Sequence, residues 1–460
     1  MLPPAPPLAQ PFGSASTLLA HGVGGRTDLP VPTGLAVAAA GTAVLVSFLA
    51  LGALWRSPQL KGARAGRPLP AGLARLLDSA VFRGVLRAVV LVLTLIVVAA
   101  AFVGPDETRF NLAPYVLYVT FWAGMVLLSL LFGPIWRVAN PLRLVHAGLA
   151  RLLGVDREQG LRPPPPGLGL WPAAIWLAVF TWLELVFPDR AEPQVVGAFF
   201  LVYLVLNVWL ALIFGARWFA QGDGFEVWFS LVARLSALGR RDDGRLVVRS
   251  PLDGVAAEPV RPGLVAVVVV LIGSTAFDGL TRTLWWTNNV AADDTGIGSL
   301  GFFGSIAVIA LAYLGAARAA TWSARRGAGA RRVPAAPEMP GLFAATLIPI
   351  AVGYTVAHYF SLLFLDGQIP LGLASDPFGQ GWDLFGTADL QVNYGLLSTT
   401  LIAGVQIGAV VLGHVLAVVS AHDRALVEVR PAKAATRSQY PLLVLMIGLT
   451  CLAIALLVGT

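Results

Sequence analysis

The chain contains ten continuous apolar stretches, each of a length that can cross a lipid bilayer as a helix. About 20 helical residues span the ~30 Å hydrocarbon core of a membrane. Because lipid offers no partners to backbone N–H and C=O groups, a spanning segment must be a helix or part of a closed barrel. The stretches lack the alternation of barrel strands, so they predict an all-α, polytopic transmembrane bundle of about ten helices. The predicted spans lie near 34–55, 86–104, 114–133, 169–187, 195–216, 262–280, 300–320, 341–365, 396–420 and 439–458.

The composition agrees with a chain whose main partner is the lipid bilayer. Only 12% of the residues are charged and 57% are hydrophobic, whereas soluble domains carry about 25% charged residues. The net charge of +7 is spread over the connections between apolar stretches. It therefore indicates membrane orientation, and no nucleic-acid partner is expected. The single cysteine, Cys451, excludes an internal disulfide and a cysteine-based metal site.

The distribution of basic residues predicts how the spans are oriented. If the N-terminus is outside, 28 of the 32 Lys and Arg residues fall in the inner connections. Only Arg26, Arg109, Arg190 and Arg282 lie outside. This asymmetry follows the positive-inside rule and predicts that both termini face outward. Arginine outnumbers lysine 30 to 2, which favours a high-GC bacterial source and a location in the bacterial inner membrane.

Three regions are distinguished along the chain: an extracytoplasmic segment over 1–33, one integral membrane domain over 34–458, and an acidic outer loop over 366–395 within it. The acidic loop contains four Asp and no Lys or Arg, and irregular loops of this length are uncommon unless functional or disordered. The inner connection 217–261 contains a pattern, beginning at Phe225, that predicts an amphipathic helix on the membrane surface. The N-terminal segment has no basic residue before its short apolar patch, so it does not resemble a signal peptide.

Two carboxylates lie near the predicted outer ends of spans. Ionisable groups at membrane depth are costly and mark either a site or a buried pair. Glu184 either reaches the membrane surface or faces a cavity. Asp278 is followed four residues later by Arg282 and preceded by Ser274 on the same helix face. The two charged residues form either an intrahelical pair or a base held by a cation.

His358 lies in the outer third of the eighth span, on one helix face with Tyr354 and Ser361. Pro349 and Gly353 precede it, and an interior proline kinks a helix and frees carbonyl groups. A broken helix with a histidine beside a cavity is one way to build a site. The alternative is a histidine that bonds to a neighbouring helix.

The outer polar residues are candidates for a hydrolytic centre. We expect His358, Asp278 and Glu184 to be catalytic, and His21, His358, Asp278 and Asp366 to hold a divalent metal ion, which is the candidate cofactor. Imidazole and carboxylate groups bind Zn²⁺ or Mn²⁺, and such an ion makes bound water nucleophilic near neutral pH. For His21, a disordered tail is the alternative. The usual catalytic motifs are missing from the sequence.

A second group of residues is assigned to packing. His414 and Gln406 share a face of the ninth span, and Gly404 and Gly408 on that span have the spacing that allows close helix contact. A proton relay is the alternative for the two polar residues. Pro349 is assigned a structural role. His146 and His422 are expected at the inner surface in contact with water.

Five sequence segments resemble a family of bacterial multi-pass membrane proteins whose members often carry the name fenitrothion hydrolase. The resemblance covers residues 20 to about 430. It implies hydrolysis of an organophosphate triester by an integral membrane protein, and it assigns no catalytic residue. The segments are His21-Gly-x-Gly-Gly-Arg-x-Asp-Leu-Pro-x-Pro, Phe132-Gly-Pro-Ile-Trp-Arg-Val-Ala-Asn-Pro-Leu-Arg143, Phe277-Asp-Gly-Leu, Ala357-His-Tyr-Phe-Ser, and Gly413-His414 with Ala421-His-Asp-Arg-Ala.

Three functions remain open from the sequence. The first is a membrane-embedded, metal-dependent hydrolase that acts on an apolar organophosphate-type ester at the outer face. The second is a transporter, in which Glu184, Asn207, His358, Gln406 and His414 line a path. The third is a non-catalytic scaffold or assembly factor that binds a partner through the acidic loop.

Overall fold

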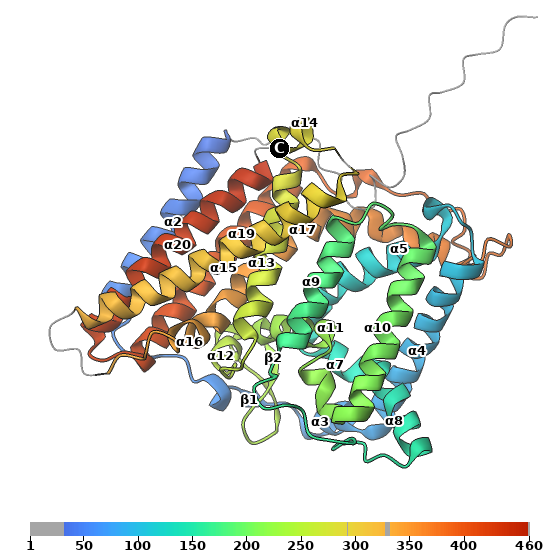
Figure 1. Cartoon of the computed structure of the whole chain (residues 1–460), viewed down its shortest axis with the longest axis horizontal. Helices are drawn as coiled ribbons and strands as arrows, with labels where there is room; N and C mark the ends of the chain where they lie inside the picture. Colours follow the sequence, from blue (N-terminus) through green and yellow to red (C-terminus); the bar gives the residue numbers. More distant parts are fainter. Residues whose placement is uncertain (1–31, 292, 327–331, 459–460) are drawn as a thin grey trace, which may run out of the picture.

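The computed structural model describes residues 32–291, 293–326 and 332–458, which form a bundle of long helices (Figure 1). In this part of the chain, nine helices or unbroken helical series are long and apolar enough to cross a membrane. The predicted all-α helical bundle is confirmed. The long helices are α2 (Thr33–Leu54), α4 (Ala80–Val103), α10 (Pro193–Phe214), α13 (Leu264–Thr281), α15 (Thr295–Arg325), α19 (Thr399–Glu428) and α20 (Ala432–Val458).

Two of the spanning series change helix type along their length. The third predicted span consists of α5 (Leu112–Tyr115), the π-helix η3 (Val116–Ala123) and α6 (Gly124–Phe132). The eighth consists of α16 (Met339–Ala344), the 3₁₀ turn η6 (Ala345–Leu347) and α17 (Ile348–Leu365). Pro349 lies in the first turn of α17, where the missing N–H costs least. What precedes His358 is a change of helix type at η6, and Pro349 does not lie in the interior of α17 as predicted.

The predicted span at 169–187 is the shorter helix α9 (Trp171–Leu185), with 15 residues. It packs against α13 and against the short helix α11 (Gly224–Val232). Several other helices extend beyond the predicted spans, because apolarity marks only the lipid-length core of a helix. Side-chain caps set the ends instead: Asp294 accepts from the Ile297 amide at the start of α15, and Ser398 does the same for Leu401 at the start of α19.

Short elements connect the long helices. The short α-helices are α3 (Ala71–Asp78), α7 (Ile135–Ala139), α8 (Leu142–Leu153), α12 (Pro251–Ala256), α14 (Leu284–Asn289) and α18 (Ile369–Leu373). The 3₁₀ turns are η1 (Gly62–Arg64), η2 (Thr108–Phe110), η4 (Ala216–Ala220), η5 (Ala233–Leu235), η7 (Asp366–Gln368) and η8 (Tyr394–Leu396). Figure 1 places α14 at one end of the bundle and α3 and α8 at the other.

A small antiparallel sheet joins two of the predicted inner connections. Its strands are β1 (Arg67–Pro68), β2 (Leu238–Arg240) and β3 (Leu246–Val248), in the order β1-β3-β2. Arg67 pairs with Val248, and Leu238 pairs with Val248 from the other side. The sheet ties the connection after α2 to the connection after α11. It was not predicted, because strands of two or three residues carry no measurable hydrophobic period.

The helix predicted to begin near Phe225 is present as α11, but its predicted place on the membrane surface is wrong. Phe225, Glu226, Trp228 and Phe229 are all buried. The helix contacts α6, α7 and α9. An apolar sequence with a single acidic residue is compatible with the interior of the bundle and with the membrane surface. Only the packing of α11 against its neighbours distinguishes the two positions.

The close helix contact predicted at Gly404 and Gly408 is also wrong within this chain. Both glycines are exposed, and an added Cβ would meet nothing within 4 Å. The close crossing of α17 and α19 occurs one to two turns further along, at Gly353 and Gly413. A Cβ at Gly413 would lie 2.6 Å from the Pro349 carbonyl oxygen, so this is where small residues let the two backbones approach.

The histidines expected in water are buried instead. The Nε2 atom of His422 donates to the Trp55 carbonyl oxygen at 2.8 Å, and its Nδ1 atom lies 2.9 Å from Oε1 of Gln439. His146 is fully buried and packs edge-on against Phe219. His414 is buried in α19, where its Nδ1 bonds to the Val410 carbonyl oxygen at 2.8 Å and its ring contacts Tyr354. The packing role predicted for His414 fits these contacts.

Candidate functional site

Three neighbouring helices bring five polar side chains together near one end of the bundle. Glu184 comes from the last turn of α9, Asp278 from the last turn of α13, and Arg282 caps α13. His358 and Tyr359 come from α17. We call these five residues the His358 cluster. Helix α13 packs against both α9 and α17, which explains how residues far apart in the sequence meet.

His358 and Asp278 form the central contact of the cluster. The Nε2 atom of His358 lies 2.7 Å from Oδ2 of Asp278. Arg282 approaches the same carboxylate oxygen at 3.3 Å and His358 Nε2 at 3.4 Å. Arginine can only donate, so Nε2 must donate to Asp278 or accept from Arg282. The much shorter distance to the carboxylate favours donation to Asp278, which leaves Nδ1 as the basic nitrogen of the ring.

Glu184 and Tyr359 form the second contact. The Tyr359 hydroxyl donates to Oε1 of Glu184 at 2.6 Å. The other oxygen, Oε2, is buried and has no hydrogen-bond partner among the described residues. A buried acceptor without a partner costs about 1–3 kcal/mol. Such atoms are rare in folded proteins, and a site that binds water or ligand is one explanation for them.

A small cavity lies between the two contacts. It is lined by Glu184, Asp278, His358 and Tyr359 and by the hydroxyl-bearing residues Thr181, Ser274 and Thr355. Its volume is about 10 Å³, close to the ~10–15 Å³ that a single water molecule requires. Polar partners surround it on several sides. The cavity can therefore hold one water molecule beside the imidazole and the carboxylates.

The π-helix η3 contributes one residue to the lining of this cavity. Its residue Trp122 lines the cavity, and the rings of Trp122 and Tyr359 meet edge to face at 6.4 Å. Tyr118, one turn earlier, donates to the Arg190 carbonyl oxygen just after α9. π-Helical turns are rare and occur frequently at functional sites. Here the wider helix presents both aromatic residues toward the end of α9.

The predicted metal centre is only partly described. His21 lies outside the described residues. Of the remaining members, His358 and Asp278 are in contact, whereas Asp366 is buried at the start of η7 and does not line the cavity. Within the described ranges, no group of three or more His, Cys, Asp and Glu side chains is placed to hold a metal ion.

A second set of buried polar residues lies toward the other end of the bundle. We call it the Glu226 network; it consists of Asn140, Arg143, Tyr203, Asp223 and Glu226. Both oxygens of Glu226 bind Arg143, and Asn140 donates to Asp223 at 2.9 Å and to Glu226 at 3.0 Å. Tyr203 donates to Asp223 at 2.5 Å, and Asp223 caps α11 by accepting from the Glu226 amide. Every carboxylate oxygen of the network thus has a donor.

A layer of aromatic rings separates the two polar groups. We define this aromatic layer as Phe121, Trp122, Phe180, Phe225 and Phe229. Ring centroids are 4.7 Å apart for Trp122 and Phe180, and 5.0 Å for Phe180 and Phe225. Phe121 contacts both Phe225 and Phe229. The layer touches Tyr359 on one side and Tyr203 on the other, so apolar packing fills the space between the cluster and the network.

Sequence reasoning found three of the five residues of the His358 cluster as site candidates and Arg282 as their neighbour. It missed Tyr359, although this residue directly follows the histidine. It also missed Asp223 and Glu226, whose signal was an acid inside the apolar run Phe225-Glu-Val-Trp-Phe. Asn140 and Arg143 lie within one of the segments quoted for the family resemblance, which assigned them no role.

Comparison with known proteins yields no relative: no protein-family model, no curated protein and no solved structure matches the chain.

Proposed function

We propose that the protein spans the inner membrane of a bacterium with about ten helices, with both termini outside. The support is the asymmetry of basic residues, which are concentrated at the end of the bundle that carries the sheet, α3 and α8 (Figure 1). In this orientation the His358 cluster lies just below the outer surface, and the Glu226 network lies toward the cytoplasm.

We infer that the His358 cluster activates a water molecule for the hydrolysis of an apolar ester of the organophosphate type. The observation that carries this inference is the 2.7 Å contact between His358 Nε2 and Asp278 Oδ2. This contact lies beside a cavity whose volume is that of one water molecule. A histidine held in one tautomer by a buried carboxylate is the arrangement of a general base. Apolar esters dissolve in lipid. Because the cavity has room for only one water molecule, the ester would have to meet the cluster at the His358 side chain, which is 12% exposed.

The surrounding hydroxyl groups suit this role. Thr181, Ser274 and Thr355 donate their protons to carbonyl groups of their own helices. Their oxygens can therefore only accept bonds from a water molecule in the cavity. A water that donates its hydrogens to His358 and to these acceptors keeps a lone pair for the attack on the ester.

The reaction balances without a further reagent. The water oxygen forms a bond to phosphorus while one water proton moves to His358 Nδ1. The bond from phosphorus to the leaving oxygen breaks, and the imidazolium returns the proton to that oxygen. The products are an acid and an alcohol. Asp278 stabilises the imidazolium during this exchange, and Arg282 lies beside the developing negative charge.

A divalent metal ion at His358 and Asp278, with His21 as a further ligand, is a variant of the same proposal. It predicts that the purified protein carries metal and loses activity after treatment with a chelator. A base mechanism through His358 alone predicts activity that is insensitive to the chelator.

Transport is the alternative that needs a polar route between the two faces. The aromatic layer between Tyr359 and Tyr203 interrupts such a route. We therefore place hydrolysis first. Flux of a solute through proteoliposomes, abolished by His358→Asn, would reverse this order.

Turnover by the purified protein tests the proposal. In lipid nanodiscs, release of nitrophenolate from apolar nitrophenyl phosphotriesters and carboxylic esters would be followed by absorbance. We expect His358→Asn to lower turnover by roughly 100-fold or more, since a general base contributes about 10²–10⁴. The matched control is His414→Asn, a buried histidine on α19 outside the cluster. No turnover by the wild-type protein on any of these esters, or equal turnover in both variants, would reject hydrolysis at His358.

A further inference from the structure

A large apolar groove lies along the first half of α13, whose second half carries Asp278 of the His358 cluster. It lies between the first half of α13, residues 306–318 of α15, and residues 332–342, which comprise a connection and the first residues of α16. Its volume is about 1070 Å³, at the upper end of the ~300–1,000 Å³ found for small-molecule sites. Tyr313 fixes one wall, because its hydroxyl donates to the Pro340 carbonyl oxygen at 2.6 Å.

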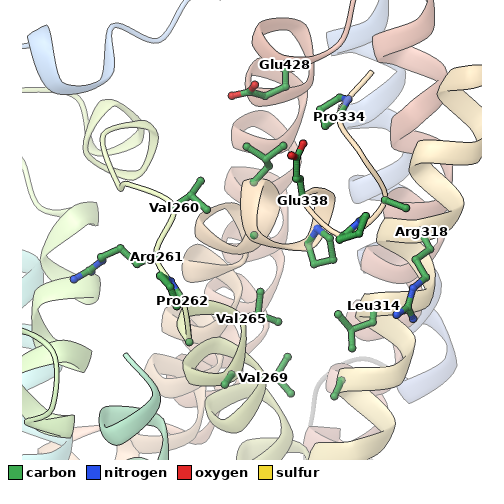
Figure 2. A pocket seen from close by; sticks show the side chains of 18 of the residues that line it. Val260, Arg261, Pro262, Val265, Val269, Leu314, Arg318, Pro334, Glu338 and Glu428 are labelled. Carbon is green, nitrogen blue, oxygen red and sulfur yellow. The ribbon is translucent and has the colours of Figure 1, made fainter. Parts of the chain in front are cut away.

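The lining of the groove is mostly apolar and includes five charged residues, which are Arg261, Arg318, Arg332, Glu338 and Glu428. On α15, Ile306, Ala310, Leu314 and Arg318 line it, and residues four apart share one helix face. Figure 2 shows Leu314 and Arg318 across the groove from Val265 and Val269 of α13. Three turns of α15 thus form an aliphatic wall, and Arg318 is the next residue on the same helix face.

The guanidinium of Arg318 forms no ion pair with the carboxylates of the described residues. The acids that line the groove are already engaged: Glu428 lies 3.5 Å from Arg332 and 3.7 Å from Arg424, and Glu338 accepts from the Ala335 amide. Arg261, a further cation at the groove, is paired with Glu258. Arg318 is exposed and is therefore the charge that an anionic partner would meet.

We propose that this groove binds an anionic phospholipid from the inner leaflet, with its phosphate at Arg318 and an acyl chain along Val265, Val269, Ala310 and Leu314. The positive guanidinium of Arg318 complements the negative phosphate of such a lipid. Basic pockets between transmembrane helices bind anionic headgroups on the cytoplasmic side in the same way. This inference rests on the proposed membrane orientation but not on hydrolysis, so the two can fail separately.

Retention of lipid by the purified protein tests the site. The full chain would be extracted from nanodiscs that contain equal amounts of dioleoyl phosphatidylglycerol and dioleoyl phosphatidylcholine, and bound lipid would be counted by native mass spectrometry. We expect the wild-type protein to keep one phosphatidylglycerol molecule in preference to phosphatidylcholine. Arg318→Gln should lower that preference by about fivefold, the order expected for one basic residue at an anionic membrane surface.

Two further variants separate the parts of the site. Arg151→Gln, at an exposed arginine on α8, makes the same charge change elsewhere at this end and should leave the preference unchanged. Ala310→Phe fills the floor of the groove and should lower retention of both lipids. Equal retention of the two lipids by the wild-type protein would overturn the proposal, as would an unchanged preference in Arg318→Gln. Competition by soluble glycerol phosphate as effective as by the lipid would also overturn it, because it would assign the site to a free phosphate ester.

Discussion

The His358 cluster and the Glu226 network are built from similar residues but differ in how completely their polar atoms are bonded. In the network, each oxygen of Asp223 and Glu226 accepts from at least one donor. In the cluster, one oxygen of Glu184 has no partner in the described part of the chain, and a cavity lies beside it. Fully bonded buried networks rigidify a fold, whereas incomplete ones leave room for a ligand or water.

The comparison indicates a division of labour along the bundle. The Glu226 network connects three helices: it contains residues at the start of α8, in the middle of α10 and at the start of α11. It therefore holds these helices together at the end of the bundle that carries the sheet. The cluster joins the ends of α9 and α13 to α17 and keeps acid–base groups in contact with a water-sized space. Similar residue types therefore stabilise the fold in one region and supply chemistry in the other.

The largest expected effect breaks the network. Glu226→Gln leaves the Arg143 guanidinium, whose side chain is 12% exposed, without its carboxylate. Removing one partner of a buried ion pair costs roughly 3–5 kcal/mol. We expect a loss of unfolding free energy of this size, measured by thermal or denaturant unfolding in detergent. Glu184→Gln in the cluster should cost less than about 1 kcal/mol, because a glutamine oxygen can still accept from Tyr359. Equal losses in the two variants would remove the distinction between the regions.

A smaller effect tests the hydrogen bond inside the cluster. In a double-mutant cycle of Tyr359→Phe and Glu184→Ala, each change removes one partner of the contact. We expect a coupling of up to about 1.5 kcal/mol in unfolding free energy, the net contribution of a typical hydrogen bond. The control is Tyr354→Phe, which removes a bond from the same helix to the Leu449 carbonyl oxygen. Its coupling to Glu184→Ala should be near zero. Additive effects for Tyr359 would show that the 2.6 Å contact contributes nothing to the native protein.

The smallest expected effect is a dependence of stability on pH that arises from Asp223 of the network. Burial, with the Glu226 carboxylate beside it, raises the pKa of Asp223 from 3.8 to about 6. Between pH 3.8 and about pH 6, Asp223 therefore keeps its proton in the folded protein but has lost it in the unfolded chain. Its contribution to stability is complete below pH 4 and is lost as the pH rises through 6.

Unfolding at two pH values measures this contribution. We expect the stability advantage of the wild-type protein over Asp223→Asn to shrink by about 1 kcal/mol between pH 5 and pH 7, at 1.36 kcal/mol per pKa unit. Asp243→Asn is the control, because contact with Arg241 lowers the pKa of Asp243 to about 2, outside this interval. An advantage that stays constant over the interval would contradict the assignment.

The sequence predicted the bundle well because lipid-length apolar runs determine where helices form. It also predicted the Asp278–Arg282 contact, which depends only on the four-residue helix repeat. The contact between His358 and Asp278 depends on how α13 packs against α17, and local periodicity contains no such information. Gly404 and Gly408 show the same limit, because the Gly-xxx-Gly spacing does not reveal which helix face meets a neighbour. Gly353 and Gly413 make that contact instead.

The shortness of α9 has a consequence for the surrounding membrane. With 15 residues at about 1.5 Å rise per residue, this helix is roughly 8 Å shorter than the ~30 Å of hydrocarbon it would have to cross. Its face with Trp171, Ile175 and Val179 is exposed, so in the proposed membrane orientation the lipid tails beside it would have to compress or tilt. A dimple in the outer leaflet at this position would bring water and headgroups down to the level of Glu184. The thickness of the host bilayer would then determine how far below the membrane surface a substrate must move to reach the site.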